Sequence, residues 1–219
     1  EEVDNTTANF SGGETTYRLY AEVSSGVVTM MFGDENSPHL ISTTTNFWNG
    51  DVFGSHANLQ SEVNTGAWAW FPQNEFDTWV ALGDSYTDAP TTVGDVGFAN
   101  DLSGSSWSFG GTPSSDASIF RVSTDPLCVP DASGRVLLGQ FTTSGDLSGY
   151  INIKGLDNGN PWEEHQIPIP SIGVAIPGCT DPIATNYDAS ATTDDGSCTY
   201  PPSSSPFVFV VSSSSFLFF

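Results

Sequence analysis

The chain has 219 residues, 37% of them hydrophobic, which is enough for one sizeable core and a smaller appended unit. Its charge is one-sided, because 26 acidic residues outnumber four basic ones and give a formal net charge of -22. Such a surface repels nucleic acid and anionic lipid head groups, so neither is expected as a partner. Salty water or divalent cations would screen it, which favours an extracellular setting such as seawater; a role in solubility alone is the alternative.

The N-terminal region has the features of a secreted protein. Glu1 is expected to follow a removed segment, because the sequence begins without Met or an apolar leader. Asn5-Thr6-Thr7 and Asn9-Phe10-Ser11 are glycosylation sequons, so Asn5 and Asn9 are candidate glycan acceptors if the host glycosylates secreted proteins.

Short β-branched and aromatic runs separated by Gly, Asn, Asp and Ser extend from about Thr15 to Ile153, and no segment has a convincing amphipathic helical pattern. Two pairs of runs are interpreted as hairpins, 17–23 with 27–32 and 135–142 with 147–153. Further strands are expected at 76–82, 106–109 and 119–123. Many short strands at turn-rich spacing predict an all-β fold, a β-sandwich or jelly roll over residues 1–172.

The composition changes after this region. Residues 161–170 alternate Pro and Ile, which indicates either an edge strand or a stiff linker, because proline removes a ladder donor. Residues 173–177 are interpreted as a linker. An Asp-rich unit follows at 178–200 that is too short to bury a core of its own.

The three cysteines fit one disulfide and one leftover thiol better than a metal site. Cys179 and Cys198 are the natural staple for the small unit, and closing a loop of roughly 20 residues contributes about 3 kcal/mol. Cys128 is then either a buried free thiol or a cross-link between subunits.

Residues 201–219 form a Pro/Ser linker followed by an apolar, β-prone tail. The tail is too short for a membrane span, which needs about 20 apolar residues. We expect it to pair as an added strand with a neighbouring subunit; a removed anchor signal or an uncertain stretch of sequence are the alternatives. The apolar residues of this assembly tail are Phe207, Val208, Phe209, Val210, Val211, Phe216, Leu217, Phe218 and Phe219.

The small unit reads Gly-Cys-Thr-Asp-Pro, then Asn-Tyr, then Asp-Asp-Gly-Ser-Cys, over residues 178–198. This pattern resembles the short cysteine repeat of large secreted surface proteins from marine Bacteroidetes and some marine algae and their viruses. Many copies of that repeat carry an additional cysteine where this chain has Thr185. The preceding region resembles a domain found beside such repeats, in the pieces 16–20, 32–34, 77–80, 92–94 and 135–143. The resemblance implies an extracellular setting and adhesion or appendage building, and it supplies no catalytic residues.

No enzyme activity is expected. The sequence contains no Gly-x-Ser-x-Gly, no HExxH and no Gly-rich phosphate loop, and His39, His56 and His165 occupy unrelated loop-like contexts. A pair of glycosidase carboxylates could lie anywhere among so many acidic residues.

Calcium is the ligand that the small unit favours, because Asp-Asp-Gly offers hard oxygen donors on a tight turn. The candidate ligands are Asp188, Asp194 and Asp195, with Asn186 nearby. The alternative is that these side chains form Asx turns. Residues 157–160 are a second polar turn without EF-hand alternation.

Six tryptophans suggest a rival function. Trp68 and Trp70 would share one face if their segment were a strand, and coplanar exposed rings could stack sugars. Core filling is the alternative for most of the tryptophans.

Together these features predict an extracellular structural protein, the repeating subunit of a surface filament, appendage or layer whose partners are copies of itself. An adhesive or carbohydrate-binding module of a larger secreted protein, with surface glycans as partners, is the alternative.

Overall fold

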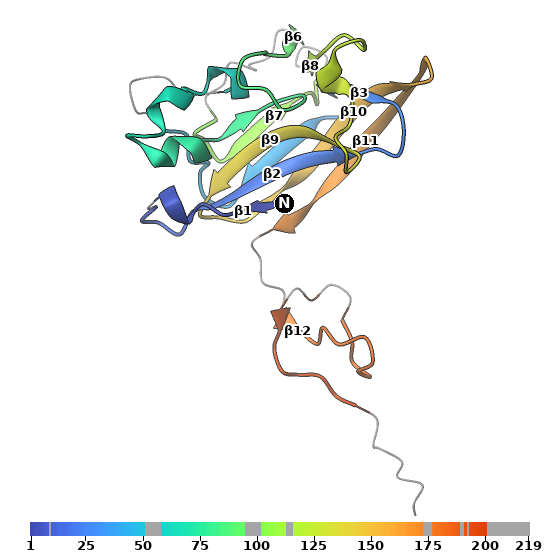
Figure 1. The fold of residues 1–219 in the computed structure, drawn as a ribbon. Helices are drawn as coiled ribbons and strands as arrows, with labels where there is room; N and C mark the ends of the chain where they lie inside the picture. The colour runs from blue at the N-terminus through green and yellow to red at the C-terminus, as the bar shows by residue number, and fades with distance from the viewer. Residues whose placement is uncertain are drawn as a thin grey trace, which may run out of the picture. The chain divides into compact units, whose positions relative to one another are not determined.

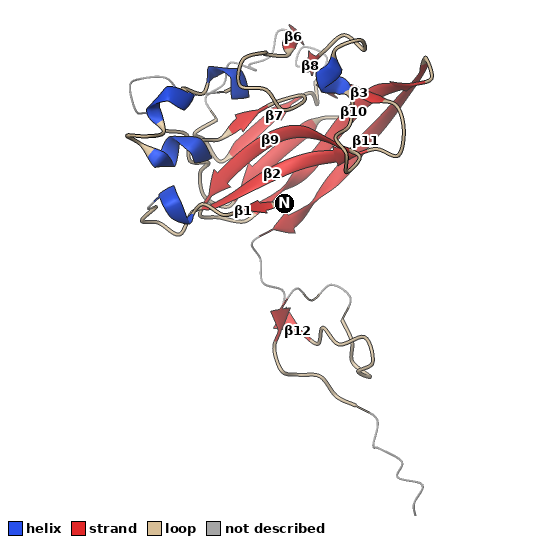
Figure 2. Cartoon of the chain, viewed as in Figure 1, coloured by secondary structure: helices blue, strands red, loops and turns tan. Residues whose placement is uncertain are grey.

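The computed structural model describes residues 1–8, 10–50, 58–94, 102–112, 116–172, 177–188, 191 and 193–200. Its contacts divide the chain into a unit from Glu1 to Gly173 and a second from Val174 to Phe219. The fold is all-β as predicted, and the helices of the described residues are short 3-10 turns (Figure 2). None of those helices is long and apolar enough to cross a membrane.

The first unit is a β-sandwich of two antiparallel sheets (Figure 1). Sheet A has the order β1-β2-β9-β5 and consists of β1 (Glu2–Val3), β2 (Thr15–Glu22), β9 (Arg135–Thr143) and β5 (Trp79–Val80). Sheet B has the order β6-β8-β3-β10-β4-β7, with β11 on β10, and consists of β6 (Thr91–Gly94), β8 (Ala117–Phe120), β3 (Val27–Gly33), β10 (Leu147–Asp157), β4 (His39–Thr43), β7 (Ser106–Phe109) and β11 (Asn160–Ile172).

Strand β10 organises sheet B. Its C-terminal half pairs with β3 and its N-terminal half pairs with β4. Strand β11 pairs along almost the full length of β10. Because a strand has only two edges, β3 and β4 share one edge of β10 and β11 occupies the other. The chain between β3 and β4 forms a short turn in which the Asp34 carboxylate accepts the amides of Asn36 and Ser37 at 2.9 and 2.7 Å.

The core lies between the two sheets and contains fully buried side chains from both, among them Phe141, Met31 and Ile41. A second cluster of Val63, Trp79, Ala81 and Leu137 includes residues from β9, from β5 and from the chain beside three short helices. These helices are η2 (Gln60–Glu62), η3 (Thr65–Ala67) and η4 (Pro72–Phe76). Since residues 136–143 of β9 are all buried, this strand is covered on both faces.

Both predicted hairpins are wrong. Strand β2 belongs to sheet A and β3 to sheet B, and the same division separates β9 from β10. The turns at 24–26 and 144–146 therefore carry the chain from one sheet to the other. The turn at 144–146 is held by a residue distant in the sequence, because the Asp146 amide donates to Thr44 Oγ1 at 2.9 Å. Turn residues alone do not distinguish a hairpin from such a crossing.

The tight hairpin of this unit is β10–β11. Its turn residues Asn158 and Gly159 have φ values of 50° and 80°, the left-handed pair that a two-residue hairpin turn requires. The polar turn at 157–160 is thus a hairpin turn, and the Pro/Ile segment is an edge strand rather than a linker.

The second unit is closed by the predicted disulfide between Cys179 and Cys198, which is confirmed with an S–S distance of 2.06 Å. Its strands are β12 (Pro177–Gly178) and β13 (Thr193–Asp194), which pair in parallel. The remaining short helices, η1 (Thr6–Ala8) and η5 (Pro126–Cys128), belong to the first unit. The Asn186 side chain joins its two halves, donating to Ser197 O and accepting from the Thr199 amide, both at 2.8 Å. The linker residues 173–176 and the assembly tail within 201–219 lie outside the described residues.

Candidate interaction groove

One side of the sandwich leaves a strand edge of each sheet without a partner strand among the described residues. On β2, strand β1 pairs only with Thr16 and Tyr17, and the Arg18 amide donates to Glu1 O at 2.8 Å. Strand β11 pairs only with β10. Figure 1 shows β2 and β11 as neighbouring strands of the two sheets on this side.

Two cavities lie between β2 and β11, and we call them together the β2–β11 groove. The larger, of about 400 Å³, is lined by Glu22, Val23, Ser24, Ser25, Ile153, Asp157, Trp162, Glu164 and Ile167. The smaller, of about 240 Å³, is lined by Glu1, Tyr17, Arg18, Leu19, Tyr20, Glu22, Arg135, Leu147, Ile169 and Pro170. Glu22 lines both cavities, so they adjoin along β2.

The floor of the groove is the incompletely covered edge of the core. Leu19, Val23, Trp162 and Ile167 are only partly buried, yet all four pack against the main core cluster. Each of them lines one of the two cavities. The sandwich therefore presents apolar surface along this side, and covering it would be favourable at about 25 cal/mol per Å².

The indole of Trp162 is held over β10 by the absence of a side chain at Gly155. These two residues are paired in the β10–β11 ladder. A Cβ on Gly155 would lie 2.2 Å from Trp162 Cζ2 and 2.0 Å from Val27 O, closer than any real contact. Glycine at this position is what allows the ring to reach the groove floor.

The two edges differ in how readily they could accept another strand. Strand β11 carries Pro161, Pro168 and Pro170, which have no N–H, and Gln166 interrupts it with a φ of 51°. Strand β2 has no proline. Because Arg18 directs its amide away from β9, the alternation of an antiparallel ladder directs the backbone groups of Tyr20 and Glu22 the same way. Among the described residues, the β2 edge is thus the one whose backbone donors and acceptors, at Tyr20 and Glu22, face away from the sheet without a partner strand.

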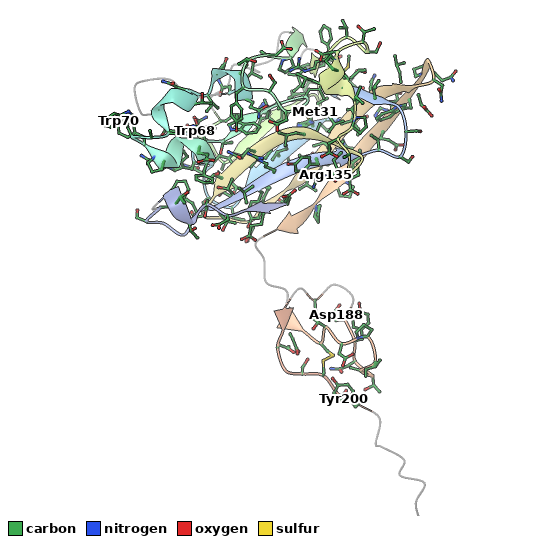
Figure 3. The ribbon with its side chains drawn as sticks, viewed as in Figure 1. Met31, Trp68, Trp70, Arg135, Asp188 and Tyr200 are labelled. Carbon is green, nitrogen blue, oxygen red and sulfur yellow. A yellow bond between two sulfur atoms is a disulfide. The ribbon has the colours of Figure 1, made fainter. Side chains whose placement is uncertain are left out.

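The rim of the groove is charged. Glu22, Asp157 and Glu164 line its larger cavity. Beside Glu22, its partner in the β2–β9 ladder, the Arg135 guanidinium lies 4.3 Å from the centre of the Tyr20 ring and 2.8 Å from the Glu1 carboxylate (Figure 3). A negatively charged segment would be repelled from the acidic end.

All four cationic side chains have partners within the sandwich. Arg135 pairs with Glu1, and Lys154 Nζ lies 2.9 Å from the Glu163 carboxylate. Arg18 Nε donates to Gln140 Oε1 at 3.1 Å. The buried Arg121 donates to Leu82 O at 2.5 Å and to the Asp125 carboxylate at 2.9 Å. Three of the four cations are therefore paired with carboxylates, whereas Arg18 bonds a neutral amide.

A separate outer cavity of about 640 Å³ lies on sheet B. Its lining comprises Thr29, Met30, Arg121, Ser123, Lys154, Gly155, Leu156, Pro161, Trp162 and Glu163. Lys154 also sits over the Phe32 ring, with Nζ 4.1 Å from its centre. The cavity combines apolar surface with a charged pair, as small-molecule sites do.

The predicted tryptophan platform is wrong in its geometry, because residues 68–70 form a turn and not a strand. The Trp70 and Phe71 amides both donate to Ala67 O, at 3.0 and 2.9 Å. Trp68 packs edge-on against Tyr86 with ring centres 5.4 Å apart, whereas Trp70 is 81% exposed (Figure 3). The two rings therefore do not form one flat surface, and core filling is confirmed for Trp79 and Trp107, which are fully buried.

The candidate calcium ligands make local hydrogen bonds. The carboxylates of Asp194 and Asp195 accept the amides of Gly196 and Ser197 at 3.0 and 2.8 Å, which are Asx turns. Asn186 Oδ1 accepts from Thr199, and the Asp188 amide donates to Cys179 O at 2.9 Å. In the described part of the chain no three acidic, His or Cys side chains converge as a metal site would require. Calcium binding stays a prediction.

Of the two predicted glycan acceptors, Asn5 lies within the described residues and its side chain is hydrogen-bonded. Asn5 Nδ2 donates to Glu14 O at 3.0 Å and to Thr16 Oγ1 at 3.1 Å, and a glycan on this nitrogen would replace one of those hydrogens. This geometry argues against modification of Asn5 in the folded chain. Asn9 lies outside the described residues.

Cys128 is free and fully buried, which confirms the buried-thiol interpretation. Burial, together with the neighbouring Asp125 carboxylate, raises the pKa of the thiol to about 11. A cross-link between subunits through Cys128 would require the sandwich to open. Of the histidines, His165 Nδ1 lies 2.8 Å from Ser37 Oγ, His39 is buried in the core, and His56 falls outside the described residues.

No protein-family model, curated protein or solved structure matches the chain.

Proposed function

We propose that the chain is an extracellular structural protein, the repeating subunit of a surface filament, appendage or layer. The observation that supports this most is the β2–β11 groove, where partly covered core side chains lie beside an unpaired strand edge. Natural sheet proteins blunt or cover such edges, since an exposed edge is a template for pairing with another chain. An edge used in assembly is covered by the neighbour.

Disulfide and charge support the extracellular part of the proposal. The Cys179–Cys198 disulfide persists only in an oxidising compartment. A net charge of -22 makes copies repel one another at low ionic strength. Seawater salt would shorten the screening length to a few ångströms, which permits contact between copies.

Sedimentation velocity of the full chain tests this proposal across a series of NaCl concentrations, with and without a calcium chelator. The expected result is association that increases with salt. A second component that disappears with chelator would support the calcium prediction. A chain that stays monomeric at every salt concentration would contradict the proposal.

The outer cavity favours carbohydrate binding as a second candidate. Apolar lining from Met30 and Pro161 beside the Lys154–Glu163 pair suits a sugar ring, with its C–H face on the apolar wall and its hydroxyls on the charged groups. A glycan array with the wild-type chain and Glu163→Gln tests it. Binding that Glu163→Gln reduces at least tenfold supports this candidate, and absence of any bound glycan removes it.

A further inference from the structure

We propose that the β2–β11 groove of one copy receives the apolar segment Phe207–Val211 of a second copy, as a strand added to the free edge of β2. This inference rests on the proposed assembly and names its acceptor site. The segment lies in the tail, outside the described residues, and the lining of the groove and the sequence of the segment support the contact.

The groove specifies an uncharged apolar occupant. Its floor is formed by Leu19, Val23, Trp162 and Ile167, while its rim carries Glu22, Asp157 and Glu164. From Gly196 to Phe219 the sequence carries no charged side chain, in a protein with 26 acidic residues. The tail is therefore a segment of this chain that the acidic rim does not repel.

The length and pattern of the segment also fit. Residues 207–211 read Phe-Val-Phe-Val-Val, which is β-prone and apolar on both faces of a strand. Five residues in a strand extend about 17 Å, the same as residues 19–23, which comprise the end of β2 and the following Val23. Backbone groups of Tyr20 and Glu22 supply the hydrogen bonds, and alternate side chains enter the two cavities.

Donation between copies has a geometric consequence. Each chain carries one groove and one tail, and the two are different surfaces, so the contact is head-to-tail. Such a contact leaves a free groove at one end and a free tail at the other, and it propagates into an open linear polymer unless a ring closes. The expected product is a filament.

The test uses two full-length variants, each lacking one half of the contact. Ile167→Glu places a charge on the groove floor, and Phe209→Glu places one in the tail. Each variant alone is expected to be monomeric in sedimentation velocity at the salt concentration where the wild type assembles. Mixed together they are expected to form one species of twice the monomer mass, because the tail of the first still fits the groove of the second.

Matched controls add the same charge elsewhere. Trp70→Glu changes an exposed ring far from the groove lining, and Ser204→Glu changes the spacer before the apolar segment; both are expected to assemble as the wild type does. If Ile167→Glu loses its near-ultraviolet circular dichroism, Ser24→Trp replaces it, since Ser24 is exposed on the groove rim and its substitution fills the larger cavity.

The outcomes separate this inference from the proposed function. A wild type that never assembles removes both. A wild type that assembles while either variant also assembles leaves the function standing and overturns the groove. Two monomeric variants that form no mixed dimer also overturn the groove as the acceptor. A wild type that stays monomeric and that both substitutions destabilise overturns donation between copies, because the tail would then bind the groove of its own chain.

Discussion

Asn152 Oδ1 accepts the Gln166 amide at 2.8 Å and so joins the interior of β10 to the irregular point of β11. Gln166 has a φ of 51°, which is costly for a residue with a side chain. Asn152 is fully buried, and its Nδ2 donates to Phe32 O and Ser37 O, both at 2.9 Å. One amide therefore satisfies the break in β11 and the turn between β3 and β4.

Replacing the Asn152 side-chain amide should strongly destabilise the fold. Asn152→Leu keeps the approximate volume but removes the side-chain donor to Phe32 O and Ser37 O and the acceptor of the Gln166 amide. We expect a loss of about 2–4 kcal/mol in the free energy of unfolding. Urea denaturation measures it, with Asn160→Leu at an exposed position as the control. Gln166→Gly should lower the free energy of unfolding by less than about 1 kcal/mol, or raise it, because glycine adopts a positive φ without strain. Equal losses for Asn152→Leu and Asn160→Leu would show that the network is unimportant.

Gly155 should tolerate no side chain. Gly155→Ala would force its Cβ to within 2.2 Å of the Trp162 ring and 2.0 Å of Val27 O, so the ring and the backbone must both move. We expect a fall of about 2 kcal/mol or more, typical of overpacking. Gly159→Ala meets no atom within 4 Å and pays only for its φ of 80°, about 1 kcal/mol. Thermal unfolding followed by Trp fluorescence distinguishes them, and the reverse order would contradict the packing described.

His39 should make the sandwich sensitive to acid. Its ring stacks on Phe109 with centres 4.4 Å apart, neither ring nitrogen has a hydrogen-bond partner among the described residues, and burial lowers its pKa from 6.5 to about 3. Between those two values the unfolded chain binds a proton that the folded chain excludes. Stability is therefore complete above pH 6.5 and falls as the pH is lowered towards 3.

The size of the effect follows from the same shift. At pH 4 the wild type should have lost about 3 kcal/mol more than His39→Leu, relative to pH 7 for each protein. Urea denaturation of both proteins at the two pH values measures the difference, and the carboxylates that also titrate cancel in the comparison. Parallel pH curves for the two proteins would contradict the buried neutral histidine.

The second unit should depend on its disulfide. Cys198→Ser opens the loop closed by Cys179 and should cost about 3 kcal/mol, more than so small a unit can lose. The amide signals of Asn186 and Thr199 should move to random-coil positions in an NMR spectrum, while those of Phe141 and Leu138 in the sandwich stay. Unchanged signals from the second unit would show that its hydrogen bonds suffice without the disulfide.

The sequence predicts the fold class because the strand signals are local. The alternation in 106–109 and the run at 135–143 are strands as expected, and the end of the first unit falls where the Pro/Ile segment stops. The predicted pairing of strands into hairpins was wrong where the residues of the turn were a weak hairpin signal. Ser24-Ser25-Gly26 connects two sheets, while Asn158-Gly159, an Asn-Gly pair typical of two-residue hairpin turns, is the turn that makes a hairpin.

The groove could not be predicted because it is a tertiary feature. It forms between β2 and β11, which belong to two different sheets, and Leu19 and Trp162 are more than a hundred positions apart in the sequence. One signal was present: a glycine in the middle of a strand, as at Gly155, indicates close approach of another group. The Trp68–Trp70 prediction failed for the complementary reason, since its geometry presumed a strand in a segment that turns.

Electron microscopy of the full-length chain at seawater ionic strength would show directly whether the protein assembles. We expect regular filaments, or a layer built from them, that are absent from a grid of Phe209→Glu prepared in the same way. Single particles of monomer size for the wild type would contradict the claim that this protein is an assembly subunit.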